Sequence, residues 1–175
     1  WGVPGGTLLK TLTGHAGGVL TVALNHDGKT LASGGYDKTI KLWRVQDGTN
    51  LKTIASHTDR VAAISQSPGG QLFASGSSDH TVKFWTTANG AEILSLTANL
   101  GQVLSIAFSP DGKWLSSGGT NGTVAIWNSS DGALVRTLSD DAGWVLSVAF
   151  SPDGKLLATA YDSGTIKLWS AHEGT

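Results

Sequence analysis

The sequence predicts an all-β protein in which one four-stranded unit is repeated four times. Tryptophan recurs every 42 residues without insertion or deletion, at Trp1, Trp43, Trp85, Trp127 and Trp169. Glycine keeps the same spacing in further columns, one of them at Gly28, Gly70, Gly112 and Gly154. Between the columns lie short apolar runs, and no stretch shows the i, i+3, i+4 pattern of an amphipathic helix over a useful length. A fixed period of this length indicates a stack of supersecondary units.

The fourth repeat shows the predicted strands and turns in order. Its four runs, of about five residues each, are residues 134–138, 145–150, 156–160 and 165–169. The sequence Ser-Pro-Asp-Gly at 151–154 predicts a tight turn, because proline fixes φ and glycine accepts a positive φ. Residues 162–164 predict a second turn. Apolar residues at successive positions of one run indicate sheets covered on both faces, as in a radial stack of four-stranded sheets.

One set of residues resembles the WD-repeat β-propeller family. The set is Gly14-His15, Ser33, Asp37 and Trp43, and the turn Phe150-Ser151-Pro152-Asp153-Gly154 accompanies it. The resemblance covers the whole chain, although the Trp-Asp ending of the family is replaced here, as in Trp43-Arg44. It implies a single propeller unit over residues 1–175 with four four-stranded blades. The sequence repeats are 1–42, 43–84, 85–126 and 127–168, and residues 169–175 begin a fifth.

The resemblance gives the recurring His, Ser, Asp and Trp a structural role. In the family these side chains form a buried hydrogen-bond chain within a blade, and a hydroxyl held in such a chain is a poor nucleophile. We therefore expect a structural network, and not a catalytic triad, at His15, Ser33, Asp37, Trp43, His57, Ser75, Asp79 and Trp85. The equivalent residues of the third blade are Asn99, Ser117, Asn121 and Trp127, and those of the fourth are Asp141, Thr159, Ser163 and Trp169. The network is expected intact in two blades and degraded in two.

A second column predicts a surface. Gly18, Arg60, Gln102 and Trp144 share one position, and no core position would tolerate such a series. In the family this end of the ring is a common docking face, so we expect a protein-binding face that also includes the residues near the second turn. The candidate residues are Trp144, Arg60, Gln102, Tyr36, Ser78, Thr120 and Tyr161.

Four repeats are few for a closed ring, because members of the family usually close with seven or eight blades. Two copies would give eight, and the phase of the chain fits a homodimer with two strand-exchange closures. Leu8, Leu9, Lys10, Thr11 and Leu12 form an orphan outer strand, which would pair in the other copy with Thr165, Ile166, Lys167, Leu168 and Trp169. Residues 1–84 carry eight basic and five acidic side chains, whereas residues 85–175 carry four basic and eight acidic, so opposite charges would meet.

Composition excludes several classes of function. With 12 Lys and Arg against 13 Asp and Glu, no global charge directs the chain to nucleic acid or an anionic membrane. The absence of cysteine removes a thiolate nucleophile and cysteine-ligated zinc. No apolar run approaches the roughly 18 residues of a membrane span. We expect a soluble chain, compatible with the cytoplasm, with no catalytic residue, metal or cofactor.

The leading interpretation is a non-enzymatic WD-repeat propeller that serves as a protein-binding or assembly scaffold. One alternative is an engineered or excised half-propeller whose only activity is self-assembly into a closed ring. A minor alternative is a small-ligand or enzyme site at the central channel, which would need a polar cluster that occurs in one repeat only.

Overall fold

The computed structural model describes residues 5–97 and 101–171, and every regular element in those ranges is a β-strand. Sheet 1 consists of β1 (Val19–Leu24), β2 (Thr30–Gly35), β3 (Ile40–Arg44) and β4 (Asn50–Ile54). Sheet 2 consists of β5 (Val61–Gln66), β6 (Leu72–Ser77), β7 (Thr81–Thr86) and β8 (Glu92–Thr97). Sheet 3 consists of β9 (Val103–Phe108), β10 (Trp114–Gly119), β11 (Thr123–Asn128) and β12 (Leu134–Ser139). Sheet 4 consists of β13 (Val145–Phe150), β14 (Leu156–Tyr161) and β15 (Ile166–Ser170).

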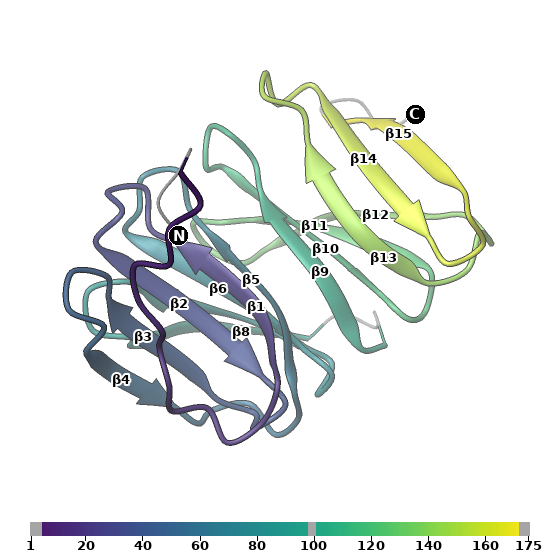
Figure 1. Ribbon diagram of the computed structural model, residues 1–175. Helices are drawn as coiled ribbons and strands as arrows, with labels where there is room; N and C mark the ends of the chain where they lie inside the picture. Colours follow the sequence, from purple (N-terminus) through teal and green to yellow (C-terminus); the bar gives the residue numbers. More distant parts are fainter. Residues whose placement is uncertain (1–4, 98–100, 172–175) are drawn as a thin grey trace.

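The sheets are antiparallel meanders that follow one another as an open arc (Figure 1). Adjacent sheets are joined through their first strands, since β1, β5, β9 and β13 lie next to one another in chain order. In sheets 1, 2 and 3 the first strand comes from one sequence repeat and the outer strand from the next repeat. For example, β12 lies in repeat 4 but completes sheet 3. Sheet 4 has three strands. Its outer strand would come from residues after Trp169, and the described part of the chain forms no strand beyond β15.

The turns form as the sequence predicts. At the end of β13 the amide of Gly154 donates to the carbonyl of Ser151 over 2.8 Å, and Gly154 has a φ of +71°, which suits a residue without a Cβ. In the second turn of sheets 3 and 4 glycine also takes a positive φ, whereas Lys38 and His80 occupy the same position in sheets 1 and 2 at φ values of +65° and +71°. The backbone of these two residues therefore has a conformation that is unfavourable for a residue with a Cβ and lowers the stability of the fold slightly.

The hydrophobic core lies between adjacent sheets. At the first interface Ile40 and Leu42 of β3 pack with Val61 and Ile64 of β5, and Phe73 and Trp85 complete the cluster. The close approach depends on Gly34, because a Cβ added there would lie 2.6 Å from Val61 Cγ1. Equivalent clusters fill the second and third interfaces.

A hydroxyl group on the first strand of one sheet also links it to the next sheet. The Ile64 amide donates to Thr21 Oγ1 over 3.0 Å, the Phe108 amide to Ser65 Oγ over 3.2 Å, and the Val148 amide to Ser105 Oγ over 3.1 Å. These bonds satisfy amides that point out of each sheet toward its neighbour, so they fix the spacing of the first strands.

The two ends of the arc expose apolar sheet faces. On sheet 1, Val22 is 61% exposed and Leu24 57%, whereas on sheet 4 Ile166 is 73% exposed and Leu168 68%. Residues of the N-terminal segment cross sheet 1 (Figure 1), where Lys10 Nζ donates to the Gln46 carbonyl over 2.9 Å. Residues 8–12 are not in a strand within the single chain. In the described part of the chain no helix has the length and apolarity needed to cross a bilayer.

Candidate protein-binding face and its supporting network

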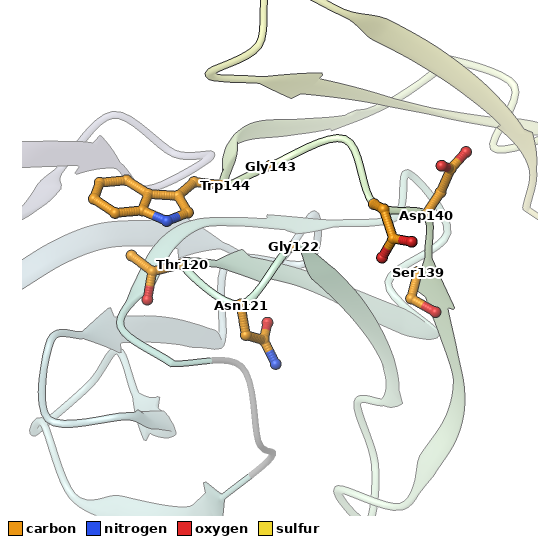
Figure 2. Close-up of a pocket in the computed structure, with 8 residues that line it drawn as sticks. Thr120, Asn121, Gly122, Ser139, Asp140, Gly143 and Trp144 are labelled. Carbon is orange, nitrogen blue, oxygen red and sulfur yellow. The ribbon is translucent and has the colours of Figure 1, made fainter.

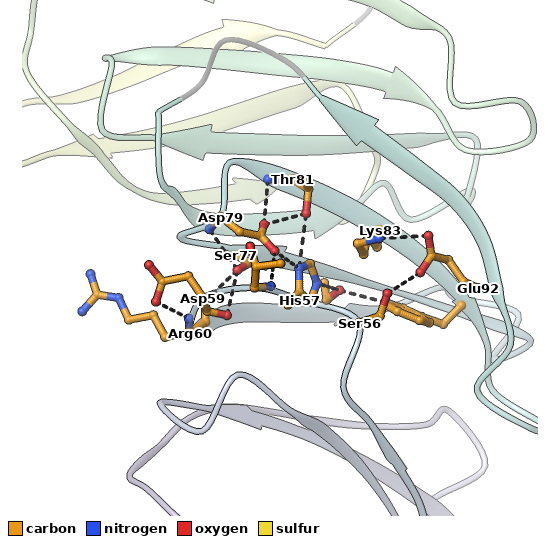
Figure 3. Close-up of polar contacts among 12 residues, drawn as sticks. Ser56, His57, Asp59, Arg60, Ser77, Asp79, Thr81, Lys83 and Glu92 are labelled. Atoms are coloured by element: carbon orange, nitrogen blue, oxygen red, sulfur yellow. Dashed lines mark hydrogen bonds and ion pairs between the residues drawn. The ribbon is translucent and has the colours of Figure 1, made fainter.

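The expected hydrogen-bond network is present in the first two blades. In sheet 2, Trp85 Nε1 donates to Ser75 Oγ over 2.8 Å, and His57 lies between Ser75 Oγ at 2.7 Å and Asp79 Oδ2 at 2.8 Å. Thr81 Oγ1 donates to the same carboxylate (Figure 3), and so does the Thr58 amide. His15, Ser33, Asp37 and Trp43 repeat this arrangement with the same distances in sheet 1.

The protons of the network have one consistent assignment. The indole of Trp85 donates to Ser75, the proton of Ser75 points to His57 Nε2, and His57 Nδ1–H donates to Asp79. Burial lowers the pKa of His57, which favours this neutral ring even though Asp79 acts in the opposite sense. Burial tends to raise the pKa of Asp79, but hydrogen bonds from Thr81, Thr58 and His57 outweigh it and lower that pKa to about 2. Every polar group is paired, so the chain of bonds fixes the loop before β5 and the turn after β6.

Within the described residues, blades 3 and 4 keep the tryptophan–hydroxyl bond of the network. Trp127 still donates to Ser117 Oγ over 2.7 Å, and Trp169 donates to Thr159 Oγ1 over 2.9 Å. Asn99 lies outside the described residues, and Asp141 of repeat 4 is exposed. The tryptophan–hydroxyl bond is therefore common to all four blades, whereas the His–Asp bonds occur in two.

The candidate face consists of paired positions that recur in each blade. The residue before the first strand accepts, through its carbonyl, a hydrogen bond from the amide 18 positions later. The four pairs are Gly18 with Tyr36, Arg60 with Ser78, Gln102 with Thr120, and Trp144 with Asp162, at 2.9, 3.0, 3.0 and 3.1 Å. These backbone bonds place one side chain of each column at the same end of every blade.

Arg60 joins three of the blades at this face. Its Nε donates to Ser78 Oγ over 2.9 Å, and its Nη2 donates to Gln102 Oε1 over 3.2 Å. The guanidinium carbon lies 5.6 Å from the ring centroid of Tyr36, which is a cation–π distance. The backbone amide of Gln102 in turn donates to Thr120 Oγ1 over 2.9 Å. A continuous run of contacts thus extends from Tyr36 in blade 1 to Thr120 in blade 3.

Trp144 stands at the end of this run and is 52% exposed. It borders a cavity of about 320 Å³ that is also lined by Thr120, Asn121, Asp140 and Asp141. Figure 2 shows the indole at one side of this cavity, close to Thr120, with Asp140 at the opposite side. The backbone of Trp144 is held by Asp162, whose Oδ1 accepts from the Trp144 amide over 2.8 Å.

Two of the expected face residues do not reach the surface. Tyr161 is only 3% exposed and packs with Val145, Val148 and Leu157, so it belongs to the core. It stands one position before the column of Tyr36, and neighbouring residues of a strand point to opposite faces. Asp162 occupies that column instead and is exposed. Ser78 is 4% exposed and lies beneath Arg60, so it supports the face without presenting its side chain.

The proposed closure segments lie at the two ends of the arc. Residues 8–12 lie beside sheet 1, where Lys10 contacts Gln46, and Leu8 and Leu9 are 58% and 70% exposed. Lys167 of β15 forms an ion pair with Asp140, which follows β12 of sheet 3, and its Nζ lies 5.4 Å from the Tyr161 ring centroid. Trp1 lies outside the described residues. Among the residues the structure describes, no group of three His, Cys, Asp or Glu side chains is placed to hold a metal ion.

Comparison with known proteins agrees with this architecture. Residues 38–175 match the family described as the first β-propeller of IFT122, and residues 6–44 match the WD domain, G-beta repeat. The periodic tryptophan protein 2 homolog of Schizosaccharomyces pombe is 49% identical over 43 residues, which is 25% of this chain and 5% of that protein. The probable cytosolic iron-sulfur protein assembly protein Ciao1 of Anopheles gambiae is 58% identical over 36 residues, 21% of this chain and 11% of that protein.

A third relative is the vegetative incompatibility protein HET-E-1 of Podospora anserina, 56% identical over 34 residues, 19% of this chain and 2% of that protein. Each alignment is about the length of one repeat, so this chain spans only a small part of each relative. The first of the two family matches covers more than half of the chain. The chain therefore belongs to the WD-repeat β-propeller family.

Proposed function

We propose that this chain is a non-enzymatic scaffold that binds a protein or peptide on the face formed by Tyr36, Arg60, Gln102, Thr120 and Trp144. WD-repeat propellers typically act as interaction scaffolds and not as enzymes. The observation that carries the proposal is the hydrogen-bonded run from Arg60 to Thr120, with an exposed aromatic ring at each end.

The chemistry of this face suits an extended segment of a partner protein. Tyr36 and Trp144 offer large rings that lose little conformational entropy on binding, and exposed aromatic and arginine side chains are the commonest anchors of protein interfaces. Arg60 is already held by Ser78 and Gln102, so little of its side-chain freedom remains to be lost when a partner binds.

The test is selection of binders from a random peptide library, followed by affinity measurement with purified variants. Replacing Trp144 with alanine should weaken the selected peptides by about tenfold or more, which is the range of an aromatic anchor. Ile93→Ala is the matched control, because Ile93 is 46% exposed on β8, away from this face. Equal affinities for wild type and Trp144→Ala would contradict the proposal.

We also propose that the chain closes with a second copy as an eight-bladed ring. The exposed apolar faces of sheets 1 and 4, the open edge of β15 and the opposite net charges of the two halves of the chain support this assembly. Residues 8–12 of each copy would then form the outer strand beside β15 of the other. Sedimentation equilibrium checks the mass: a well-behaved monomer of 18.0 kDa at high concentration would rule out the ring.

A further inference from the structure

The three interfaces inside the chain share one steric feature. A glycine of the second strand faces a valine of the next sheet, in the pairs Gly34 with Val61, Gly76 with Val103, and Gly118 with Val145. A Cβ added to these glycines would lie 2.6, 2.5 and 2.4 Å from the valine Cγ1. Carbon atoms in contact stand about 3.5–4.0 Å apart, so a methyl group overlaps the valine at every internal interface.

At the exposed end of the arc this column carries a methyl group. Ala160 of β14 occupies the position of Gly34, Gly76 and Gly118, on the open face of sheet 4 with Leu168. The valine column continues at Val19 of β1, which is 50% exposed on the open face of sheet 1. If two copies join as the internal sheets do, Ala160 of one therefore meets Val19 of the other. Valine is stiff at χ1, so it yields little to the added methyl group.

We propose that the Ala160–Val19 contact makes the junction between two copies looser than the three internal interfaces, so that the ring opens at its two junctions and stays intact elsewhere. This inference rests on the proposed eight-bladed ring. The occupant of the open face is a second copy, because the face continues an interface that the chain already forms three times and because the opposite charges of the two halves would meet there.

A polar contact at the same junction fits the internal pattern. Thr21 and Ser105 each accept a hydrogen bond from the amide 43 positions later, on the next sheet. The next member of their column is Ser147, which is exposed on β13. The matching amide in a second copy belongs to Val22 of β1. This hydroxyl and the apolar faces favour the usual register between the two sheets, whereas the methyl group of Ala160 opposes it.

The experiment compares dimer dissociation constants by sedimentation for the full chain and for Ala160→Gly. Removing an overpacked methyl should favour association about fivefold at each junction, hence about 25-fold for a ring with two junctions. Ala158→Gly is the matched control, since it makes the same change two residues away on the same face. Ala158 matches Ala32 and Ala74, which are buried at the internal interfaces, so its loss should weaken the dimer.

A double-mutant cycle assigns the effect to the proposed pair. Val19→Ala should weaken the dimer more when residue 160 is glycine than when it is alanine, because the valine fills the space only in the first case. A dimer that Ala160→Gly fails to tighten, or tightens no more than Ala158→Gly does, would overturn this inference and leave the proposed ring standing. If wild type and all variants remain folded monomers, the ring and the inference both fail. A monomeric wild type with a dimeric Ala160→Gly would show that the methyl group blocks the junction outright, and the native ring and the inference that depends on it would both fail.

Discussion

Replacing His57 with alanine is the most direct test of the network that holds blade 2. His57 is 6% exposed and makes two side-chain hydrogen bonds of 2.7 and 2.8 Å to Ser75 and Asp79. After the substitution, Asp79 keeps donors from Thr81 and Thr58, so the carboxylate is not left unpaired. Ser75 still accepts from Trp85 but loses the acceptor of its own proton.

The expected cost follows from these remaining contacts. The loss of the two hydrogen bonds costs about 1–2 kcal/mol of folding free energy. This is toward the lower end of the usual cost of two lost bonds, because Asp79 keeps its other hydrogen-bond donors. The cavity left by the imidazole ring, which lies 6.2 Å from the Trp85 ring between centroids, adds about 1–2 kcal/mol. A total of about 3 kcal/mol lowers the melting temperature of a chain of this length by about 6–12 °C.

Thermal unfolding followed by circular dichroism measures this change. His26→Ala is the matched control, because His26 is exposed in the turn after β1, and it should change the stability by less than about 0.5 kcal/mol. The partial networks of blades 3 and 4 predict that Asn99→Ala lowers the melting temperature less than His15→Ala or His57→Ala. An equal or larger effect of Asn99→Ala would refute the assignment of the network to the first two blades.

Three further predictions concern the face, the N-terminal segment and pH. Trp144→Ala should change the free energy of unfolding by less than about 0.5 kcal/mol, because the indole is half exposed; a loss above about 2 kcal/mol in urea titration would make it a core residue. Deleting residues 1–6 should leave the dimer intact in sedimentation, whereas deleting residues 1–13 should cause dissociation or aggregation. Equal behaviour of the two deletions would contradict the proposed pairing of residues 8–12 with β15 of the other copy. Stability should fall as the pH drops below 6.5, since unfolded His57 takes up a proton while its folded-state pKa is lower, and His57→Gln should flatten this part of the profile.

Most of the fold could be predicted because each strand lies at a fixed distance from a tryptophan or a glycine turn. The surface position of Trp144 could be inferred too, since a column that holds glycine, arginine, glutamine and tryptophan cannot be buried. The buried position of Tyr161 was missed for a reason that the sequence contains. It aligns with Gly35, Ser77 and Gly119, one residue before the surface column, and strand alternation turns it inward.

Other parts of the face could not be predicted from the repeat pattern. The contacts of Arg60 with Tyr36 and Gln102 depend on the rotation between neighbouring sheets, which the spacing of residues within one repeat does not determine. The bond from the Trp144 amide to Asp162 Oδ1 is the counterpart of the bond from the Gln102 backbone amide to Thr120 Oγ1, and both depend on side-chain conformations that the repeat spacing does not determine. The steric role proposed for Ala160 could not be predicted either, because it depends on how closely the glycines of its column pack against valine.

The offset between sequence repeat and sheet has a consequence for how such genes change. Sheets 1, 2 and 3 each take their outer strand from the following repeat, so β4 belongs to the same repeat as β5. Recombination can duplicate or remove one 42-residue unit. Wherever in the repeat the breakpoint falls, the repeat that then follows still supplies the outer strand of the sheet before it. Blade number can therefore rise or fall in a single genetic event without passing through an intermediate that has a broken internal sheet.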